Sequence, residues 1–208
     1  MKLYLGSKHV QFPNALKQLV GVQPKKAIVR VSVNAFDNYP ENRRLEHINT
    51  LVSSIEGVGY SCEMLDLREY ANKKKKLREV LRGANLLWVS GGNVFYLRYV
   101  MELCGLDKIL SDLLKNGLVY GGDSAGAAVL GPNMHGLDLL DDPAEAPVVL
   151  FEGLGITPFI VLPHWGNERY NNEIKDSYEE LIEHNKEVVR ISDSQACVVD
   201  GDSRKIHG

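Results

Sequence analysis

Short apolar runs alternate along this chain with longer amphipathic stretches, and this alternation constrains the fold more than any other feature. Short apolar runs suit buried strands, whereas apolar positions that recur every three or four residues line one face of a helix. The pattern predicts βα units that feed a largely parallel sheet. The expected strands are 3–5, 27–33, 61–65, 86–89, 118–120, 159–162 and 188–191, and the clearest expected helices are 42–55 and 170–182.

Two segments depart from this alternation. Residues 195–199 have the pattern of a strand, Asp200-Gly201 that of a turn and 204–206 that of a partner strand, which predicts an antiparallel addition near the C-terminus. Residues 131–150, which are rich in Asp and Pro, predict a long loop of the kind that often serves a site. With no internal repeat or linker, we expect a single α/β domain over residues 1–208.

Composition excludes several classes of protein. The 208 residues are 44% hydrophobic and 25% charged, as in a globular protein with a substantial core. A net charge of −3 gives no electrostatic argument for nucleic acid or a membrane surface as partner. The one strong charge run, Lys73 to Lys76, begins an expected helix and is typical of a solvated face.

The cysteines point to a reducing compartment. Cys62, Cys104 and Cys197 are scattered, without the paired spacing of a zinc or dithiol site, so we expect buried free thiols. The first residues are too short an apolar stretch for a signal peptide, and no window has the length of a membrane span. We therefore expect a cytoplasmic protein with no metal and no organic cofactor.

The motif Gly122-Asp123-Ser124-Ala125-Gly126 makes Ser124 a candidate nucleophile. It follows an expected strand and precedes a short helical stretch, and a serine on such a sharp turn needs small neighbours so that the backbones can approach. The Ala125 N–H would lie at the positive end of a helix and could donate to an oxyanion. A purely structural strand-turn-helix junction favours the same small residues, so the motif alone does not decide the function.

Two further candidates lie just after expected strands, where ligands gather in open parallel sheets. His164 follows strand 159–162, and Asp193 follows strand 188–191. A serine needs a base to remove its proton, and the base needs a carboxylate to hold its tautomer. Ser124, His164 and Asp193 could supply these three roles.

The identity of the acid stays open from the sequence, because Ser192-Asp193-Ser194 is also ordinary turn chemistry. Asp138, Asp141 and Asp142 in the long loop are competing carboxylates. The order Ser, His, acid differs from the Ser, acid, His order of the α/β-hydrolases, which argues against an ordinary esterase or lipase.

A second glycine-rich turn, Ser90-Gly91-Gly92-Asn93, lies between strand 86–89 and a helix that begins near residue 94. Asn93 suits the N-cap of that helix. The N–H groups of Gly91 and Gly92 could form a second part of an oxyanion hole together with the Ala125 N–H. The alternative is a tight βα turn that needs positive φ.

The other histidines carry less weight. His135 in the long loop could approach the site. We expect His9, His47, His184 and His207 at surface or helical positions, without acidic or cysteine neighbours at metal-binding spacing.

Three motifs occur in one order: Val89-Ser90-Gly91-Gly92-Asn93, then 121–127 with the serine elbow, then Pro163-His164-Trp165. Together they resemble the dipeptidase E and cyanophycinase family of serine peptidases, over most of the chain. The resemblance implies a flavodoxin-like three-layer sandwich similar to class I glutamine amidotransferases, with a serine where those enzymes carry a cysteine. It also implies Ser124 as nucleophile, His164 as base, and the N–H groups of Gly92 and Ala125 as oxyanion donors.

The resemblance further implies a short peptide substrate, with an N-terminal aspartyl residue or a β-linked aspartyl unit. An acidic substrate needs a cationic partner, and Arg169 and Arg98 are candidates, although exposed arginines on helices are usually only solvated. The alternatives are an amidotransferase-like glutaminase, a general esterase or amidase, and a non-catalytic or regulatory member of the fold. We expect a monomer or a homodimer.

Overall fold

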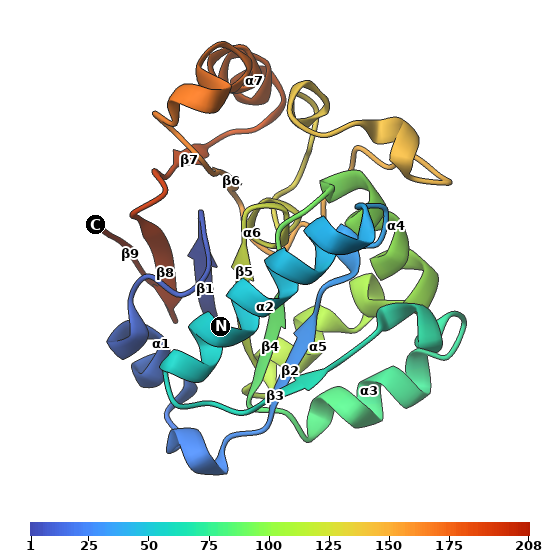
Figure 1. The fold of residues 1–208 in the computed structure, drawn as a ribbon, viewed down its shortest axis with the longest axis vertical. Helices are drawn as coiled ribbons and strands as arrows, with labels where there is room; N and C mark the ends of the chain where they lie inside the picture. Colours follow the sequence, from blue (N-terminus) through green and yellow to red (C-terminus); the bar gives the residue numbers. More distant parts are fainter.

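The computed structural model of the protein describes residues 1–208, apart from the side chain of Asn171. Its main sheet has the strand order β3-β2-β4-β5-β1-β8-β9 (Figure 1). The strands from β3 to β1 are parallel, β8 is antiparallel to β1, and β9 is antiparallel to β8. A smaller sheet pairs β6 with β7 in parallel. The strands are β1 (Lys2–Gly6), β2 (Val29–Ser32), β3 (Cys62–Met64), β4 (Leu86–Val89), β5 (Val119–Asp123), β6 (Ile160–Leu162), β7 (Val188–Arg190), β8 (Ala196–Asp200) and β9 (Ser203–His207).

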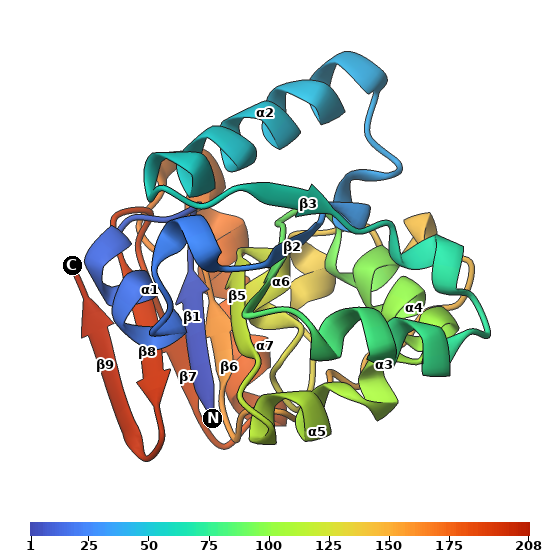
Figure 2. The same cartoon turned by 90° about the horizontal axis from the view of Figure 1, so that it is seen from below.

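Helices cover both faces of the main sheet. They are α1 (Pro13–Val20), α2 (Glu41–Gly57), α3 (Lys74–Arg82), α4 (Val94–Cys104), α5 (Leu110–Lys115), α6 (Ala125–Ala128) and α7 (Asn171–His184). Figure 2 shows α2 on one side of the sheet and α3, α4 and α5 on the other. The architecture is the expected flavodoxin-like α/β sandwich with an antiparallel addition at the C-terminal end.

Successive side chains of a strand pack alternately into two apolar layers, one on each face of the main sheet. In β4, Leu87 and Val89 pack with α3 to α7, whereas Leu86 and Trp88 pack with α1 and α2. Successive strand residues point to opposite faces, so a strand buried on both sides is apolar throughout. This is why β4 could be recognised as a continuous apolar run.

β5 extends further than expected. The sequence pattern ended this strand at Tyr120, but its pairing continues through Gly121 and Gly122 to Asp123. A side chain at Gly121 would meet Trp88, because a Cβ there would lie 2.3 Å from Trp88 Cε3. A Cβ at Gly122 would lie 2.5 Å from the Gly126 carbonyl oxygen. These glycines therefore make room for a buried indole and for α6, and they do not break the strand.

β6 and β7 do not join the main sheet as the alternation suggested. The free edge of β1 is taken by the antiparallel β8, which pairs with it from Lys2 to Gly6. β6 and β7 therefore pair with each other, and α7 packs beside them (Figure 1). The predicted long loop follows α6, with 3₁₀ turns at Leu137–Leu139 and Pro143–Glu145.

Two of the three cysteines are buried, as expected from the sequence, and the lysine run is solvated. Cys104 and Cys197 are buried free thiols, and Cys62 is a half-buried one. The lysine run lies exposed at the start of α3. Among the described helices, none combines the length and the apolar character needed to cross a membrane.

Candidate active site

Ser124 sits on a strained turn between β5 and α6. Its backbone has φ 49° and ψ −114°, a region that residues with a side chain rarely adopt. Ser124 N–H donates to the Gly6 carbonyl of β1 at 3.0 Å, and the Ser124 carbonyl accepts from Ala127 and Ala128 at the start of α6. The strand and the helix thus hold the turn from both sides, and the half-buried serine lines the pocket at the carboxyl end of the sheet.

His164 follows β6 and Pro163, and it too has a positive φ, 61°. Its Nε2 lies 3.0 Å from Ser124 Oγ, and its Nδ1 lies 2.6 Å from Asp193 Oδ1. The His164 N–H donates to Ser7 Oγ at 2.8 Å, which fixes the backbone beneath the ring. The imidazole therefore lies between a serine and a carboxylate, with one ring nitrogen facing each.

Asp193 follows β7 and accepts four hydrogen bonds. Oδ1 accepts from Ser7 Oγ at 2.8 Å and faces His164 Nδ1, while Oδ2 accepts from Asn167 Nδ2 and faces Lys8 Nζ, both at 2.7 Å. Burial raises the pKa of this carboxyl, but the hydrogen bonds from Lys8, His164 and Ser7 outweigh it and hold the pKa well below its usual range. Asp193 is therefore a carboxylate, fixed in place, at any physiological pH.

The three competing aspartates of the long loop are engaged elsewhere. Asp138 accepts from the Gly136 N–H, Asp141 from the Val94 N–H and Asp142 from the Ala144 N–H. Of these carboxylates and Asp193, only Asp193 hydrogen-bonds His164 in the part of the chain that the structure describes. The geometry thus separates Asp193 from the loop aspartates, which the sequence could not do.

The glycine turn before α4 contributes one N–H fewer than the sequence suggested. The Gly91 N–H donates to Asp123 Oδ2 at 3.2 Å, so the expectation of a free donor at Gly91 is wrong. For the N–H groups of Gly92 and Ala125, the described residues offer no hydrogen-bond acceptor, and both residues line the pocket at Ser124. Gly92 has φ +129°, and a Cβ there would lie 2.2 Å from the Ala35 carbonyl oxygen, so this position requires glycine.

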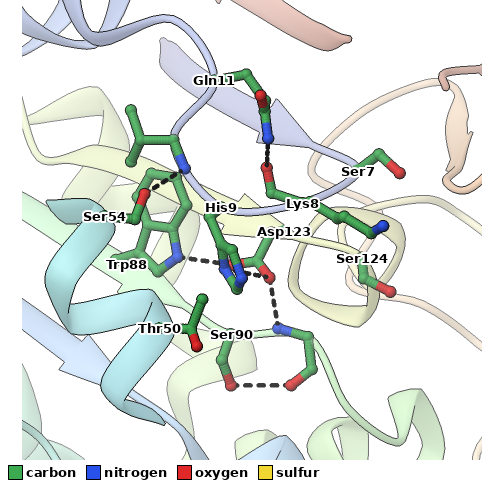
Figure 3. Close-up of polar contacts among 12 residues, drawn as sticks. Ser7, Lys8, His9, Gln11, Thr50, Ser54, Trp88, Ser90, Asp123 and Ser124 are labelled. Carbon is green, nitrogen blue, oxygen red and sulfur yellow. Dashed lines mark hydrogen bonds and ion pairs between the residues drawn. The ribbon is translucent and has the colours of Figure 1, made fainter. Parts of the chain in front are cut away.

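A short segment after β1 completes the site. Ser7 and Lys8 contact Asp193, and His9 lies beside Asp123, with 3.9 Å between His9 Nδ1 and Asp123 Oδ2 (Figure 3). The surface position expected for His9 is therefore wrong, because its imidazole lines the pocket beside a buried carboxylate. The sequence did hold a signal for this segment, because it directly follows an expected strand, the position in which parallel sheets place site residues.

A pocket of about 440 Å³ opens at Ser124, a size typical of sites for small molecules. Besides the residues above, its lining includes Arg43 and His47 of α2, Asp141 of the long loop and Arg169. Arg43 and Arg169 have no carboxylate partner among the described residues and stack on Tyr39 and Tyr170. The periodicity of α2 did not reveal this role, because it identifies the buried face of a helix and not the residues at its rim.

Two other sequence candidates lie away from the pocket. Arg98 is buried in α4, where its Nε donates to the Glu152 carbonyl. His135 stacks on Phe151 and His184, with ring centroids 4.1 Å and 4.6 Å apart. Neither lines the pocket, so the suggested approach of these two residues to the site is wrong.

Comparison with known proteins agrees with the fold and the motifs. An "Uncharacterized peptidase" of Listeria monocytogenes is 26% identical over 149 residues, which cover 71% of each chain. A "Probable alpha-aspartyl dipeptidase" of Drosophila melanogaster is 30% identical over 166 residues, which cover 76% of this chain and 65%, less than two thirds, of the fly protein.

A solved structure shares the whole architecture. It is described as a "1.5A Crystal Structure of a Putative Peptidase E Protein from Listeria monocytogenes EGD-e", and it matches with a TM-score of 0.85 and 20% identity over 99% of this chain and 97% of the other. The model of "Peptidase family S51" matches residues 44–207. Since that match covers most of the chain, the protein belongs to peptidase family S51 and is a serine-type peptidase.

Proposed function

We propose that the protein hydrolyses short peptides with an acidic N-terminal residue, through an acyl-enzyme on Ser124. The observation that carries this proposal is the continuous line from Ser124 Oγ through His164 to Asp193, with contacts of 3.0 Å and 2.6 Å. A nucleophile, a base and an acid that orients the base are the three groups that serine hydrolysis needs. Ser124 and His164 line a pocket large enough for a dipeptide.

In the proposed reaction, Ser124 Oγ attacks the scissile carbonyl carbon while His164 Nε2 takes its proton. The charge on the carbonyl oxygen is stabilised by the N–H groups of Gly92 and Ala125. The C–N bond then breaks, and Nε2 gives its proton to the leaving amine. Water, activated by the same nitrogen, attacks the ester and releases the acid product and the free serine.

Charge in the pocket supports an acidic substrate. The chain carries a net charge of −3, yet the more exposed charged side chains of the pocket, Lys8, Arg43 and Arg169, are cationic. Lys8 is neutralised by Asp193, so Arg43 and Arg169 are the cations left for a substrate carboxylate. Arginine suits that role because its planar group binds a carboxylate through two hydrogen bonds.

Asp141 supports the recognition of a free amino terminus. It lines the same pocket, and its Oδ2 accepts only the Val94 N–H among the described residues. Burial raises the pKa of Asp141 to about 7. A substrate ammonium group would supply the positive charge that this buried carboxylate lacks, so the pocket has complementary groups for both the amine and the side chain of an N-terminal aspartate.

Labelling of the serine tests the nucleophile. We expect a fluorophosphonate to label the wild-type protein at Ser124, and we expect Ser124→Ala to abolish both labelling and peptide hydrolysis. Ser194→Ala is a matched control, because Ser194 is exposed and lies outside the pocket lining. A wild-type protein that takes no label would instead identify a non-catalytic member of the family.

Competition between substrates tests the specificity. We expect Asp-Leu to be cleaved with a higher kcat/KM than Asn-Leu, which has the same shape without the charge, and Arg43→Met or Arg169→Met to remove this preference. Faster cleavage of p-nitrophenyl esters than of any aspartyl peptide would point to a general esterase, and release of ammonia from glutamine to a glutaminase. The three unpaired thiols suit a cytoplasmic location, which imaging of the tagged protein in its own cell would check.

A further inference from the structure

Asp123 is a buried ionisable group that the proposed reaction does not use. It directly precedes Ser124 at the end of β5 and is 4% exposed. Its Oδ1 accepts from Trp88 Nε1 at 2.8 Å, and its Oδ2 accepts from the Gly91 N–H at 3.2 Å (Figure 3). The carboxylate thus joins the nucleophile strand to the glycine turn that carries Gly92.

The turn is packed closely on this carboxylate. A Cβ at Gly91 would lie 3.0 Å from Ser124 Cβ and 3.3 Å from Asp123 Oδ2. A shift of the Asp123 side chain would therefore shift Gly91, and with it the neighbouring Gly92 N–H that faces the pocket. Because donors to an oxyanion act only at hydrogen-bond distance, this placement matters for the reaction.

Asp123 lacks a full set of partners for a buried charge. Its two hydrogen-bond donors are neutral, and burial raises the pKa of its carboxyl. His9 is the basic residue beside it: His9 Nδ1 lies 3.9 Å from Asp123 Oδ2, is itself buried, and has no hydrogen-bond partner among the described residues. An unpaired buried nitrogen thus faces an incompletely paired buried carboxylate.

The chain holds His9 in this position against its backbone preference. His9 has φ 28°, in the region that favours glycine. Hydrogen bonds on both sides fix the segment: Ser7 Oγ donates to Asp193, the Val10 N–H donates to Ser54 Oγ at 2.9 Å, and the Gln11 N–H donates to Tyr4 Oη at 2.9 Å. A strained residue kept in place by its neighbours is typical of functional segments.

The other basic groups nearby are poorer partners for Asp123. Burial and the Arg43 guanidinium lower the pKa of His47 on α2, so its imidazole is disfavoured as a cation. Lys8 is paired with Asp193, and His164 also faces Asp193. His9 therefore remains as the group that can supply a charge to Asp123.

We propose that His9 is the counter-ion of Asp123 and that this pair positions the Gly91-Gly92 turn against Ser124. His9 is then a positioning residue, which acts through Asp123 and not on the substrate. The expected effect of this pair on the reaction rate rests on the proposed function. The ion pair itself does not, because it is a property of the folded protein.

A double-mutant cycle tests the kinetic consequence. We expect His9→Gln to lower the fluorophosphonate labelling rate and kcat by about 10-fold and Asp123→Asn by about 100-fold, with KM changed by less than about 2-fold, since the turn stabilises charge in the transition state. In the Asp123→Asn protein, His9→Gln should have no further effect. His9→Lys, which keeps the charge, should recover most of the rate. His184→Gln, at an exposed position, should leave the rate unchanged.

Nuclear magnetic resonance tests the pair without any activity. In ¹H–¹⁵N spectra of the imidazole rings, we expect both ring nitrogens of His9 to carry protons in the wild-type protein and only one of them to do so in Asp123→Asn. An unchanged His9 signal in Asp123→Asn would overturn the proposal, as would an equal loss of rate from His9→Gln in both backgrounds. A wild-type protein that takes no label but shows the expected spectra would refute the proposed function and leave the ion pair intact.

Discussion

Ser124 and His164, which contact each other, both have a positive φ, 49° and 61°. Non-glycine residues in this region cost about 1 to 3 kcal/mol each, and such strain persists only where the surrounding structure imposes it. Here β1, β5 and α6 impose it on Ser124, and Ser7 Oγ imposes it on His164. The strain places the two side chains toward one another, so geometry for the reaction is obtained at the expense of stability.

This strain can be measured at Ser124. We expect Ser124→Gly and Ser124→Ala both to be inactive, with the glycine variant more stable by about 1 kcal/mol because glycine adopts a positive φ without a steric penalty. Thermal unfolding of the two variants gives the comparison. Equal melting temperatures would show that the backbone at Ser124 is relaxed.

The low pKa of Asp193 predicts a pH-dependent contribution to stability. A carboxyl group whose pKa is lower in the folded than in the unfolded state stabilises the protein above the unfolded value, about 3.9, and this contribution is lost as the pH falls toward the folded value. We expect Asp193→Asn to lower the melting temperature at pH 7 and this deficit to shrink below about pH 4. A deficit independent of pH would assign the effect to packing and not to charge.

Asp141 predicts the opposite trend. Because burial raises its pKa to about 7, ionisation of Asp141 costs stability as the pH rises from the unfolded value toward 7 and above. Asp141→Asn should therefore stabilise the free protein at pH 8, stabilise it progressively less as the pH falls, and have little effect below about pH 4. If Asp141 binds the substrate amine, the same change should raise KM for peptides with a free amino terminus and leave N-acetylated peptides unaffected. A rise in KM for both kinds of peptide would contradict that role.

At the level of elements, much of the fold follows from apolar periodicity and from the rule that site residues follow strands. This rule predicted Ser124, His164 and Asp193, and the structure brings the three side chains into contact. The extension of β5 was missed because glycines in sequence look like a turn, and only the position of Trp88 explains them as strand residues. The separate pairing of β6 with β7 was missed because it depends on β8 occupying the edge of β1, which is a long-range competition.

The explanation that Gly121 makes room for the Trp88 indole can be tested by substitution. We expect Gly121→Ala to destabilise the protein by about 3 kcal/mol, because its Cβ would overlap the indole ring and overpacking of a dense core forces side chains off their preferred positions. The control is Gly57→Ala at the end of α2, where a Cβ meets nothing within 4 Å and should be neutral or slightly stabilising. A tolerated alanine at Gly121 would mean that Trp88 can move.

For the whole molecule, the site draws on two sheets that share one core. Ser124 belongs to the main sheet, whereas His164 and Asp193 follow the strands of the smaller one (Figure 1). Buried side chains of β6 and β7 nonetheless join those of β4 and β5 in a single apolar cluster. The expected single domain requires that the two sheets unfold together.

The two tryptophans report on the two sheets separately. Trp88 is fully buried in β4, and Trp165 directly follows His164 and stacks under Arg190 of β7. The variants Trp88→Phe and Trp165→Phe each keep one tryptophan. In each variant, we expect the urea midpoint measured by fluorescence to equal the midpoint measured by far-UV circular dichroism. Loss of the Trp165 signal, and of activity, at a lower urea concentration than loss of far-UV circular dichroism in the same variant would show that the smaller sheet opens by itself.

The position of β1 between β5 and β8 has a consequence for folding during synthesis. β1 leaves the ribosome long before its partners, which lie at residues 119–123 and 196–200. Such distant pairing is slow, and an unpaired apolar strand is prone to aggregation while it waits. The segment Ser7-Lys8-His9 can meet Asp193 only after synthesis has passed residue 193, so a shorter nascent chain has no assembled site. β1 is the segment on which we expect a chaperone to act.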